Sequence, residues 1–375
     1  MHSQNSIPVI YYHSVGNHSI KKPWSFLTCD LKTFELQMKA LKYFGFKTCS
    51  MKQLDDHVSG LTRLPKKTIH IQFDDGFLDN WAIVYPIMKK LEFKFTILVT
   101  PDFISKHERR KFCSNPTESN LSEWWGYLSE QELIELDKDP LVDIQAHGYS
   151  HTWYASSKKI IGVNKDTNLN PWIHWNENVS KKSSWLNDPE LIGNYKLGYP
   201  IFENEKSLSN EKAFLPNKKF IEKCINLYIE NKKISTSEVS LIADEFDKNG
   251  ELGRFENVNE TNERYRVELE GTRNYLEKIL GRSVDYLVWP GGGNSEKTVN
   301  LALDYGYKLV SKGNKLNDFG SGVKQISRVA AFIQFKPKIL SPYLNLILIF
   351  VQISRASGNI LIAKIVNFLK KVIQK

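Results

Sequence analysis

Residues 68–76 read TIHIQFDDG, and this stretch carries the first indication of the fold. Its first six residues are rich in β-branched and aromatic side chains, which predicts a buried strand over 68–73. Asp74 and Asp75 follow at the end of that strand, where α/β proteins place their functional groups. Adjacent residues of an extended chain point opposite ways, so one carboxylate can bind a metal ion while the other faces a substrate. The alternative is a DDG turn without function.

Similar strand patterns lie on both sides of this stretch, with helical patterns between them. The expected strands cover 7–12, 94–99, 141–146, 285–289, 308–310 and 323–329. The expected helices cover 31–44, with Asp30 as N-cap, and 80–91, 265–280 and 296–305. Strands that alternate with helices predict an α/β architecture with a parallel sheet.

Two stretches depart from this alternation. Residues 153–262 hold many Asn, Ser, Lys and aromatic residues, and we expect a lid or small subdomain there because a structureless loop of that length is uncommon. Most of its tryptophans are expected in a core, with one or two at a binding site. Residues 336–375 form a basic, amphipathic helical tail. The main domain therefore spans 1–335, interrupted by 153–262.

The charge is distributed unevenly. The chain has 51 Lys and Arg against 42 Asp and Glu, and nine of the basic residues follow Asp318 while no acidic residue does. A neutral body with a basic tail argues against nucleic-acid binding and favours contact between the tail and an anionic membrane. The alternative left open is a tail helix that packs on the domain with its lysines in water.

Several protein classes are excluded by pattern. The four cysteines lie far apart without a CxxC, which argues against a disulfide scaffold or a cysteine zinc site. The first residues lack a secretory pattern, and no apolar run reaches the roughly 18 residues that span a bilayer. We therefore expect a cytoplasmic location, with peripheral contact to the inner face of the cytoplasmic membrane.

Two further motifs follow predicted strands. His147 and His151, in AHGYSHT, are four residues apart, and a helical turn would place both imidazoles on one face. Two histidines and one carboxylate make a three-ligand site with open positions, as a catalytic metal requires. The other motif, WPGGG at 289–293, lets the backbone approach a ligand, and the Gly291 N–H can face an oxyanion; a simple turn is the alternative.

Together and in this order, these motifs resemble the polysaccharide deacetylase family with the NodB homology domain. PVIYYHSV at 8–15 and DLKTFELQMKALKYFGFKTCSMKQL at 30–54 add a likeness to members that act on poly-N-acetylglucosamine. The resemblance covers about 7–152 and 263–335. It implies a distorted (β/α)7 barrel and a hydrolase that removes an N-acetyl group from an amino sugar of a surface polysaccharide or lipid-linked glycan.

The resemblance also implies the role of each site residue. Asp74 is the general base, Asp75, His147 and His151 bind one divalent metal ion, usually zinc, and the Gly291 N–H helps to hold the oxyanion. The positions implied to bind substrate are Tyr12, His13, Trp289, Pro290 and Gly292.

Two departures from the family pattern stand out. Many members carry an Arg in the third motif, where this chain has Val288; Arg328, in QISRV, either replaces it or lies on the surface. The usual general acid is a late histidine, but no histidine follows His174, so the acid is unassigned, with His174 and Asp74 as candidates. The alternative functions are a deformylase of a lipid-linked amino sugar, an exported polymer deacetylase, and a non-catalytic glycan-binding protein on the same barrel.

Overall fold

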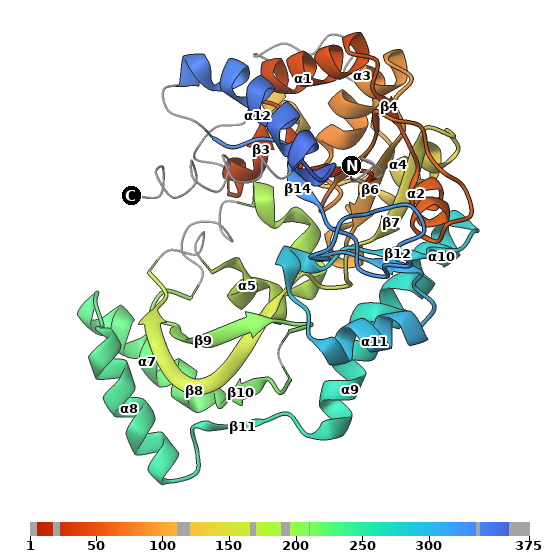
Figure 1. Cartoon of the computed structure of the whole chain (residues 1–375). Coiled ribbons are helices and arrows are strands. Elements are labelled where there is room, and N and C mark those ends of the chain that lie inside the picture. The colour runs from red at the N-terminus through yellow and green to blue at the C-terminus, as the bar shows by residue number, and fades with distance from the viewer. Residues whose placement is uncertain are drawn as a thin grey trace.

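A computed structural model describes residues 6–17, 23–110, 121–165, 170–188, 196–209, 211–334 and 338–359. Within these ranges, eight strands form one sheet in the order β13-β12-β7-β6-β5-β1-β14, with β4 paired to β5 outside this path. Every pairing in this sheet is parallel. The sheet curls and helices cover its outer face (Figure 1). This is the predicted distorted (β/α) barrel.

The elements of the barrel follow the predicted alternation closely. Its strands are β1 Val9–Tyr12, β4 Lys47–Thr48, β5 Thr68–Phe73, β6 Phe95–Val99, β7 Val142–Ala146, β12 Tyr286–Leu287, β13 Leu309–Val310 and β14 Val329–Ala330. Its helices are α1 Leu31–Tyr43, α2 Met51–Val58, α3 Tyr85–Lys90, α4 Glu130–Asp137, α9 Val258–Arg266, α10 Thr272–Leu280, α11 Glu296–Asp304 and α12 Ser341–Ala356.

The barrel core is built from the apolar strands and the amphipathic helix that the sequence predicts. Every residue of β5 and β6 is buried, as expected for central parallel strands covered on both faces. Helix α1 begins at Asp30, whose carboxylate accepts the Thr33 N–H at 2.9 Å. The helix then buries Phe34, Met38 and other apolar residues at helical spacing in the main core.

Two predicted elements differ from the structure. The expected strand over 323–329 was wrong for most of its length, because only Val329 pairs with β1, while Gln325 makes a single bridge to Val310. The Asn317 side chain binds both the N–H and the carbonyl of Ser327, so these groups do not enter a ladder. The expected helix over 265–280 begins earlier, at Val258, and contains a π-helical turn, η6, over Val267–Gly271.

A second sheet lies beside the barrel, within the stretch predicted as a lid or subdomain (Figure 1). Its strands are β8 Trp153–Val163, β9 Pro200–Lys206, β10 Phe214–Pro216 and β11 Gly253–Phe255, paired antiparallel in the order β11-β10-β8-β9. The helices of this part are α5 Pro171–Glu177, α7 Lys218–Asn231 and α8 Thr236–Lys248. Its core includes Phe77 and Phe103 from barrel loops, so the second sheet is docked over the ends of β5 and β6.

The C-terminal segment is helical where it is described. Helix α12 packs against α1, and the Gln37 side chain of α1 donates to the carbonyls of Ala331 and Asn345. Residues 360–375, the C-terminal 16 of the 40 residues in the predicted tail, lie outside the described residues. Within the described ranges, no helix combines the length and apolar character that a membrane crossing requires.

Candidate metal centre and active site

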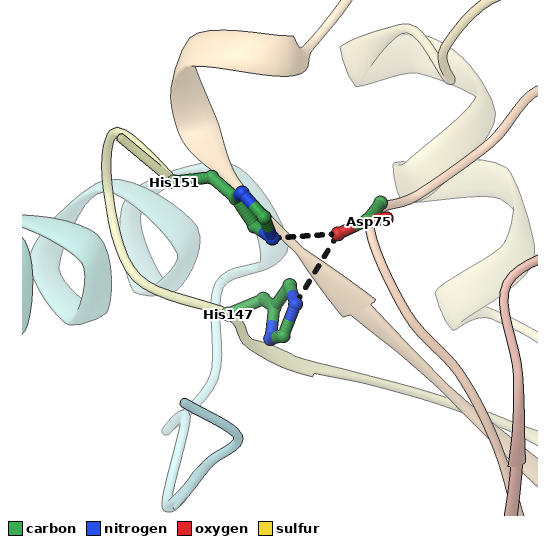
Figure 2. Close-up of side chains that lie close together, drawn as sticks. All are labelled: Asp75, His147 and His151. Carbon is green, nitrogen blue, oxygen red and sulfur yellow. Dashed lines mark ion pairs between the residues drawn. The ribbon is translucent and has the colours of Figure 1, made fainter. Parts of the chain in front are cut away.

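Asp75, His147 and His151 meet at the carboxyl ends of β5 and β7 (Figure 2). The Nε2 atom of each histidine lies 3.2 Å from Asp75 Oδ1. One ligand atom from each of the three residues lies within 4.8 Å of the others, and all three side chains are buried. The structure therefore brings together the three ligands that the sequence predicted.

The chemistry of this group fits a divalent metal ion. Asp75 Oδ1 is buried without a hydrogen-bond partner. His147 Nδ1 lies 2.8 Å from the Val288 carbonyl, which can only accept, so Nδ1 carries the proton and the Nε2 lone pair faces Asp75. Two imidazole nitrogens and one carboxylate oxygen are a common ligand set of catalytic zinc. A cation would satisfy the unpaired oxygen and both lone pairs.

The loop between the two histidines is not helical, so their side chains meet without the helical turn that the sequence analysis considered. Gly148 has φ +70°, and a Cβ there would lie 2.6 Å from Pro290 Cγ, so only glycine fits. His151 and Asp75 also have positive φ, 49° and 72°. A left-handed backbone costs a non-glycine residue about 1–2 kcal/mol, and such strain is typical of functional sites.

Two buried charged side chains hold the histidine loop. Glu268, on the π-helical turn η6, accepts the N–H groups of Tyr149 at 2.9 Å and Ser150 at 3.1 Å, and also the Ser150 hydroxyl. From the other side, the Lys182 ammonium donates to the Ser150 carbonyl and to Asp102. The loop that carries His151 is thus fixed by the barrel and by the inserted part together, which no sequence motif indicated.

We predict that Glu268→Ala weakens the affinity for a divalent metal about 10- to 100-fold, because the two N–H groups of the loop lose their acceptor and the ligand geometry relaxes. The affinity is measured by competition with a chelating dye. Glu270→Ala is the matched control, since Glu270 lies on the same turn and pairs with Arg266 near the surface. Equal affinities for the two variants would show that Glu268 does not position the ligands.

Asp74 is paired with Arg328, so the structure supports the first of the two interpretations of this arginine. Arg328 Nη1 and Nη2 each lie 2.7 Å from one carboxylate oxygen of Asp74, a bidentate arrangement. The guanidinium also lies 4.3 Å from the centre of the Tyr11 ring. Burial raises the pKa of Asp74, but Arg328 and the nearby His147 outweigh it, so the net pKa is below the usual value.

We predict that Arg328→Gln lowers kcat/KM about 100-fold and moves the acidic limb of its pH profile to higher pH. The base works only when deprotonated. Without the guanidinium, burial dominates and raises the Asp74 pKa, so activity is lost at a higher pH than in the wild type. Arg328→Lys should restore the position of the acidic limb more fully than kcat/KM, because lysine returns the positive charge without the bidentate guanidinium geometry. An unmoved limb in Arg328→Gln would argue against this pairing as the control of Asp74.

The ligands and Asp74 lie in one cavity of about 730 Å³ between the barrel and the second sheet. Of the other predicted site residues, His13, Gly291, Gly292 and Arg328 line this cavity. Lining residues that were not singled out from the sequence include Tyr11, Trp24, Asn170, Asn204 and Lys312.

Tyr12 does not line the cavity, so the prediction that it binds substrate was wrong. Its hydroxyl donates to Gln37 Oε1 at 2.7 Å, and its ring stacks on Phe73 in the core. Adjacent residues of a strand face opposite ways. Because His13 faces the site, Tyr12 faces the core and Tyr11 faces the site. The alternation along β1 was a signal for Tyr11 that the sequence analysis did not use.

Trp289 and Pro290 are also outside the cavity lining. Trp289 is fully buried, and its indole N–H donates to the Ser311 carbonyl at 3.0 Å. Pro290 packs against Gly148 of the histidine loop. These residues position the third motif, whereas Gly291 and Gly292 reach the cavity.

The inserted part supplies aromatic walls. Trp153 and Trp172 line the cavity, while Trp175 and Trp185 belong to the second core, as expected for most of the tryptophans. His174 is buried on α5 and is not a lining residue, so the structure does not place this candidate acid at the site.

Among the histidines that the structure describes, His13 is the one with a ring nitrogen within 4.0 Å of the candidate base. Its Nε2 lies 3.8 Å from Asp74 Oδ2, and its side chain is 20% exposed. Burial lowers the pKa of His13, and the Asp74 carboxylate opposes this in part. The sequence analysis placed His13 at the site but assigned it no proton-transfer role.

A family model for polysaccharide deacetylases matches residues 62–186 and 253–310. This chain carries a polysaccharide deacetylase domain. The matched segments include Asp74, Asp75, both metal-ligand histidines and the third motif, whereas His13 and Arg328 fall outside them.

Known proteins agree with this assignment. YxkH of Bacillus subtilis (strain 168), which bears the name of a polysaccharide deacetylase, is 32% identical over 147 residues, 39% of this chain. The chain matches only 43% of the length of that relative. A de-N-acetylase from Aggregatibacter actinomycetemcomitans superposes with a TM-score of 0.53 at 15% identity, over 86% of this chain and 94% of that one. The BpsB deacetylase domain of Bordetella bronchiseptica gives 0.51 at 15%, over 88% and 96%. Both structures show the shared fold.

Proposed function

We propose that this protein is a metal-dependent N-deacetylase that hydrolyses the acetamide of an amino sugar in a surface-polysaccharide or lipid-linked glycan precursor. The observation that carries the proposal is the buried Asp75–His147–His151 group beside the Arg328-paired carboxylate of Asp74, in one cavity. The deacetylase domain supports the reaction class.

Asp75, His147 and His151 would hold the metal, and zinc is the ion we propose because this ligand set with open positions is typical of catalytic zinc. When bound, such an ion acidifies a water molecule and polarises the amide carbonyl of the substrate. The strained backbone of Asp75 and His151 and the fixed tautomer of His147 prepare the ligand atoms for one geometry.

The residues around the group then move the protons. Asp74, kept ionised and oriented by Arg328, accepts a proton from the attacking water. The Gly291 N–H is proposed to stabilise the developing oxyanion. His13, neutral at the start because its pKa is lowered, receives the proton from Asp74 across 3.8 Å and gives it to the leaving amine. The C–N bond breaks, and acetate and the free amino sugar are released.

The walls of the cavity suit a sugar. Trp24, Trp153 and Trp172 line the cavity, where indoles can stack on pyranose rings, and the amides of Asn170 and Asn204 can bind hydroxyls. A volume of about 730 Å³ is in the range of small-molecule sites, which supports a substrate of a few sugar rings at most within the cavity.

We predict that Asp74→Asn keeps one divalent ion per chain but releases no acetate, whereas Asp75→Ala and His147→Ala lose the ion. The amide of Asn cannot accept the proton, while the ligand atoms stay in place. Metal content and the release of acetate or formate are measured together on N-acetylated and N-formylated amino sugars, free and lipid-linked. Turnover by metal-loaded Asp74→Asn would refute the base assignment. Release of formate but not acetate would favour the deformylase. Wild-type protein that binds no metal ion would favour the non-catalytic glycan-binding protein.

We predict that His13→Gln lowers kcat by about 100- to 10,000-fold while leaving metal content unchanged, because the leaving amine loses its proton source. A substrate whose leaving group needs no protonation, such as an aryl acetate ester, should lose much less rate. If the rates with both substrates fall equally, His13 positions Asp74 and does not deliver the proton.

Location at the inner face of the cytoplasmic membrane stays a prediction.

A further inference from the structure

Helix α12 exposes an apolar face. Leu340, at the start of the helix, and Tyr343, Leu344 and Ile347 follow the spacing i, i+3, i+4, i+7 of one helix face. Their exposed fractions are 50%, 54%, 37% and 63%. A surface helix of a globular protein normally presents charged and polar residues on this face. Here the polar residues Asn345 and Gln352 lie on the buried face instead.

The chain segment that packs under α12 leads from this helix to a residue that lines the active-site cavity. Asn345 binds both the N–H and the carbonyl of Ile333, a residue that is 44% exposed. The next side chain, Gln334, donates to the Phe26 carbonyl at 3.1 Å. Phe26 lines the cavity and is 63% exposed. The hydrogen bonds thus connect α12 directly to the cavity mouth.

At its other end the face continues onto the end of α1. Phe350 lies one turn beyond Ile347, and its ring is 5.3 Å from that of Phe44, which is 52% exposed. Tyr43, beside Phe44, is 85% exposed. We call this surface the apolar band; its exposed members are Phe26, Ile333, Ile339, Leu340, Tyr343, Leu344, Ile347, Phe44 and Tyr43. Soluble monomers rarely gather so many exposed large apolar side chains in one region without a partner.

The charges near the apolar band are positive. The Lys32 ammonium lies 5.7 Å from the centre of the Tyr343 ring, and Lys67 donates to the Phe44 carbonyl at 3.0 Å. Helix α12 carries Arg355 and no acidic residue, and Lys338 lies in the turn just before it. Apolar side chains among uncompensated cations are complementary to an anionic lipid surface, where the rings and aliphatic groups enter the interface and the lysines meet the headgroups.

We propose that the apolar band docks on an anionic bilayer and places the cavity mouth, at Phe26, against the lipid headgroups. In naming the substrate this rests on the proposed function: the acetamide belongs to an amino sugar that a membrane lipid carries, and docking delivers that sugar to the cavity without extraction of its lipid.

The test uses the full chain with sedimenting vesicles of phosphatidylcholine, with and without 30% phosphatidylglycerol as a chosen anionic fraction of about one third. We expect the wild type to bind the anionic vesicles, and Leu344→Glu/Ile347→Glu to bind at least about tenfold more weakly. Leu241→Glu is the matched control, since Leu241 is 69% exposed on α8, far from α12 (Figure 1). Leu344, Ile347 and Leu241 are all exposed, so thermal unfolding should be unchanged in both variants.

Three results would overturn the proposal. Equal vesicle binding by the double variant and the wild type would exclude the apolar band. Loss of binding only in Lys370→Glu/Lys371→Glu would assign docking to the terminal segment instead. A wild-type dimer in light scattering that becomes a monomer in Leu344→Glu/Ile347→Glu, without vesicle binding, would make the surface a contact between copies.

Acetate release separates this proposal from the proposed function. The double variant should hydrolyse a soluble N-acetylated amino-sugar oligomer at the wild-type rate and lose at least about tenfold in rate on a lipid-linked sugar in vesicles. Vesicle binding without acetate release from either substrate in the wild type refutes the deacetylase while leaving the docking surface intact. Equal loss on both substrates would show damage to the site and refute a role limited to docking.

Discussion

The burial of two adjacent carboxylates at the end of a strand is the constraint on which this structure depends. Asp74 and Asp75 are 1% and 2% exposed, and an ionised carboxylate without a partner at such a position costs several kcal/mol. Each therefore needs its own positive counterpart. Asp74 has the Arg328 guanidinium, whereas Asp75 lies beside two histidine nitrogens, an arrangement that a shared cation would complete.

Meeting this requirement draws distant parts of the chain together. The segment that leads into β14 carries the guanidinium, the end of β12 supplies the carbonyl that orients His147, and the π-helical turn supplies the carboxylate of Glu268 that anchors the histidine loop. The order of the parallel strands makes these contacts possible, because it places the ends of β5, β7 and β12 near one another. The same site would then hold acid–base groups whose charges are set by their neighbours and not by solvent.

Local patterns were enough for the alternation of parallel strands with helices and for the boundaries of β5 and α1, whereas the barrel and the choice of Asp75 as the carboxylate ligand needed the family resemblance. What they did not reveal depends on contacts between distant segments. The partner of Arg328 lies 254 positions earlier in the chain, and Glu268 acts on a loop 118 positions before it. The wrong choice of Tyr12 in place of Tyr11 has a different cause. The site residues were assigned from the resemblance alone, and the alternation of side chains along strand β1 was not considered. The Ser327 backbone is not part of the predicted strand because the Asn317 side chain binds its N–H and its carbonyl. Strand propensity does not describe such a contact.

The place where the second sheet joins the barrel has a mechanical consequence. Strand β8 begins at Trp153, only two residues after His151, and Thr152 between them accepts the Ser207 N–H at the far end of β9. His151 and the cavity-lining Trp153 thus lie on one short stretch of backbone. A shift of the second sheet at this edge would therefore also move the His151 imidazole.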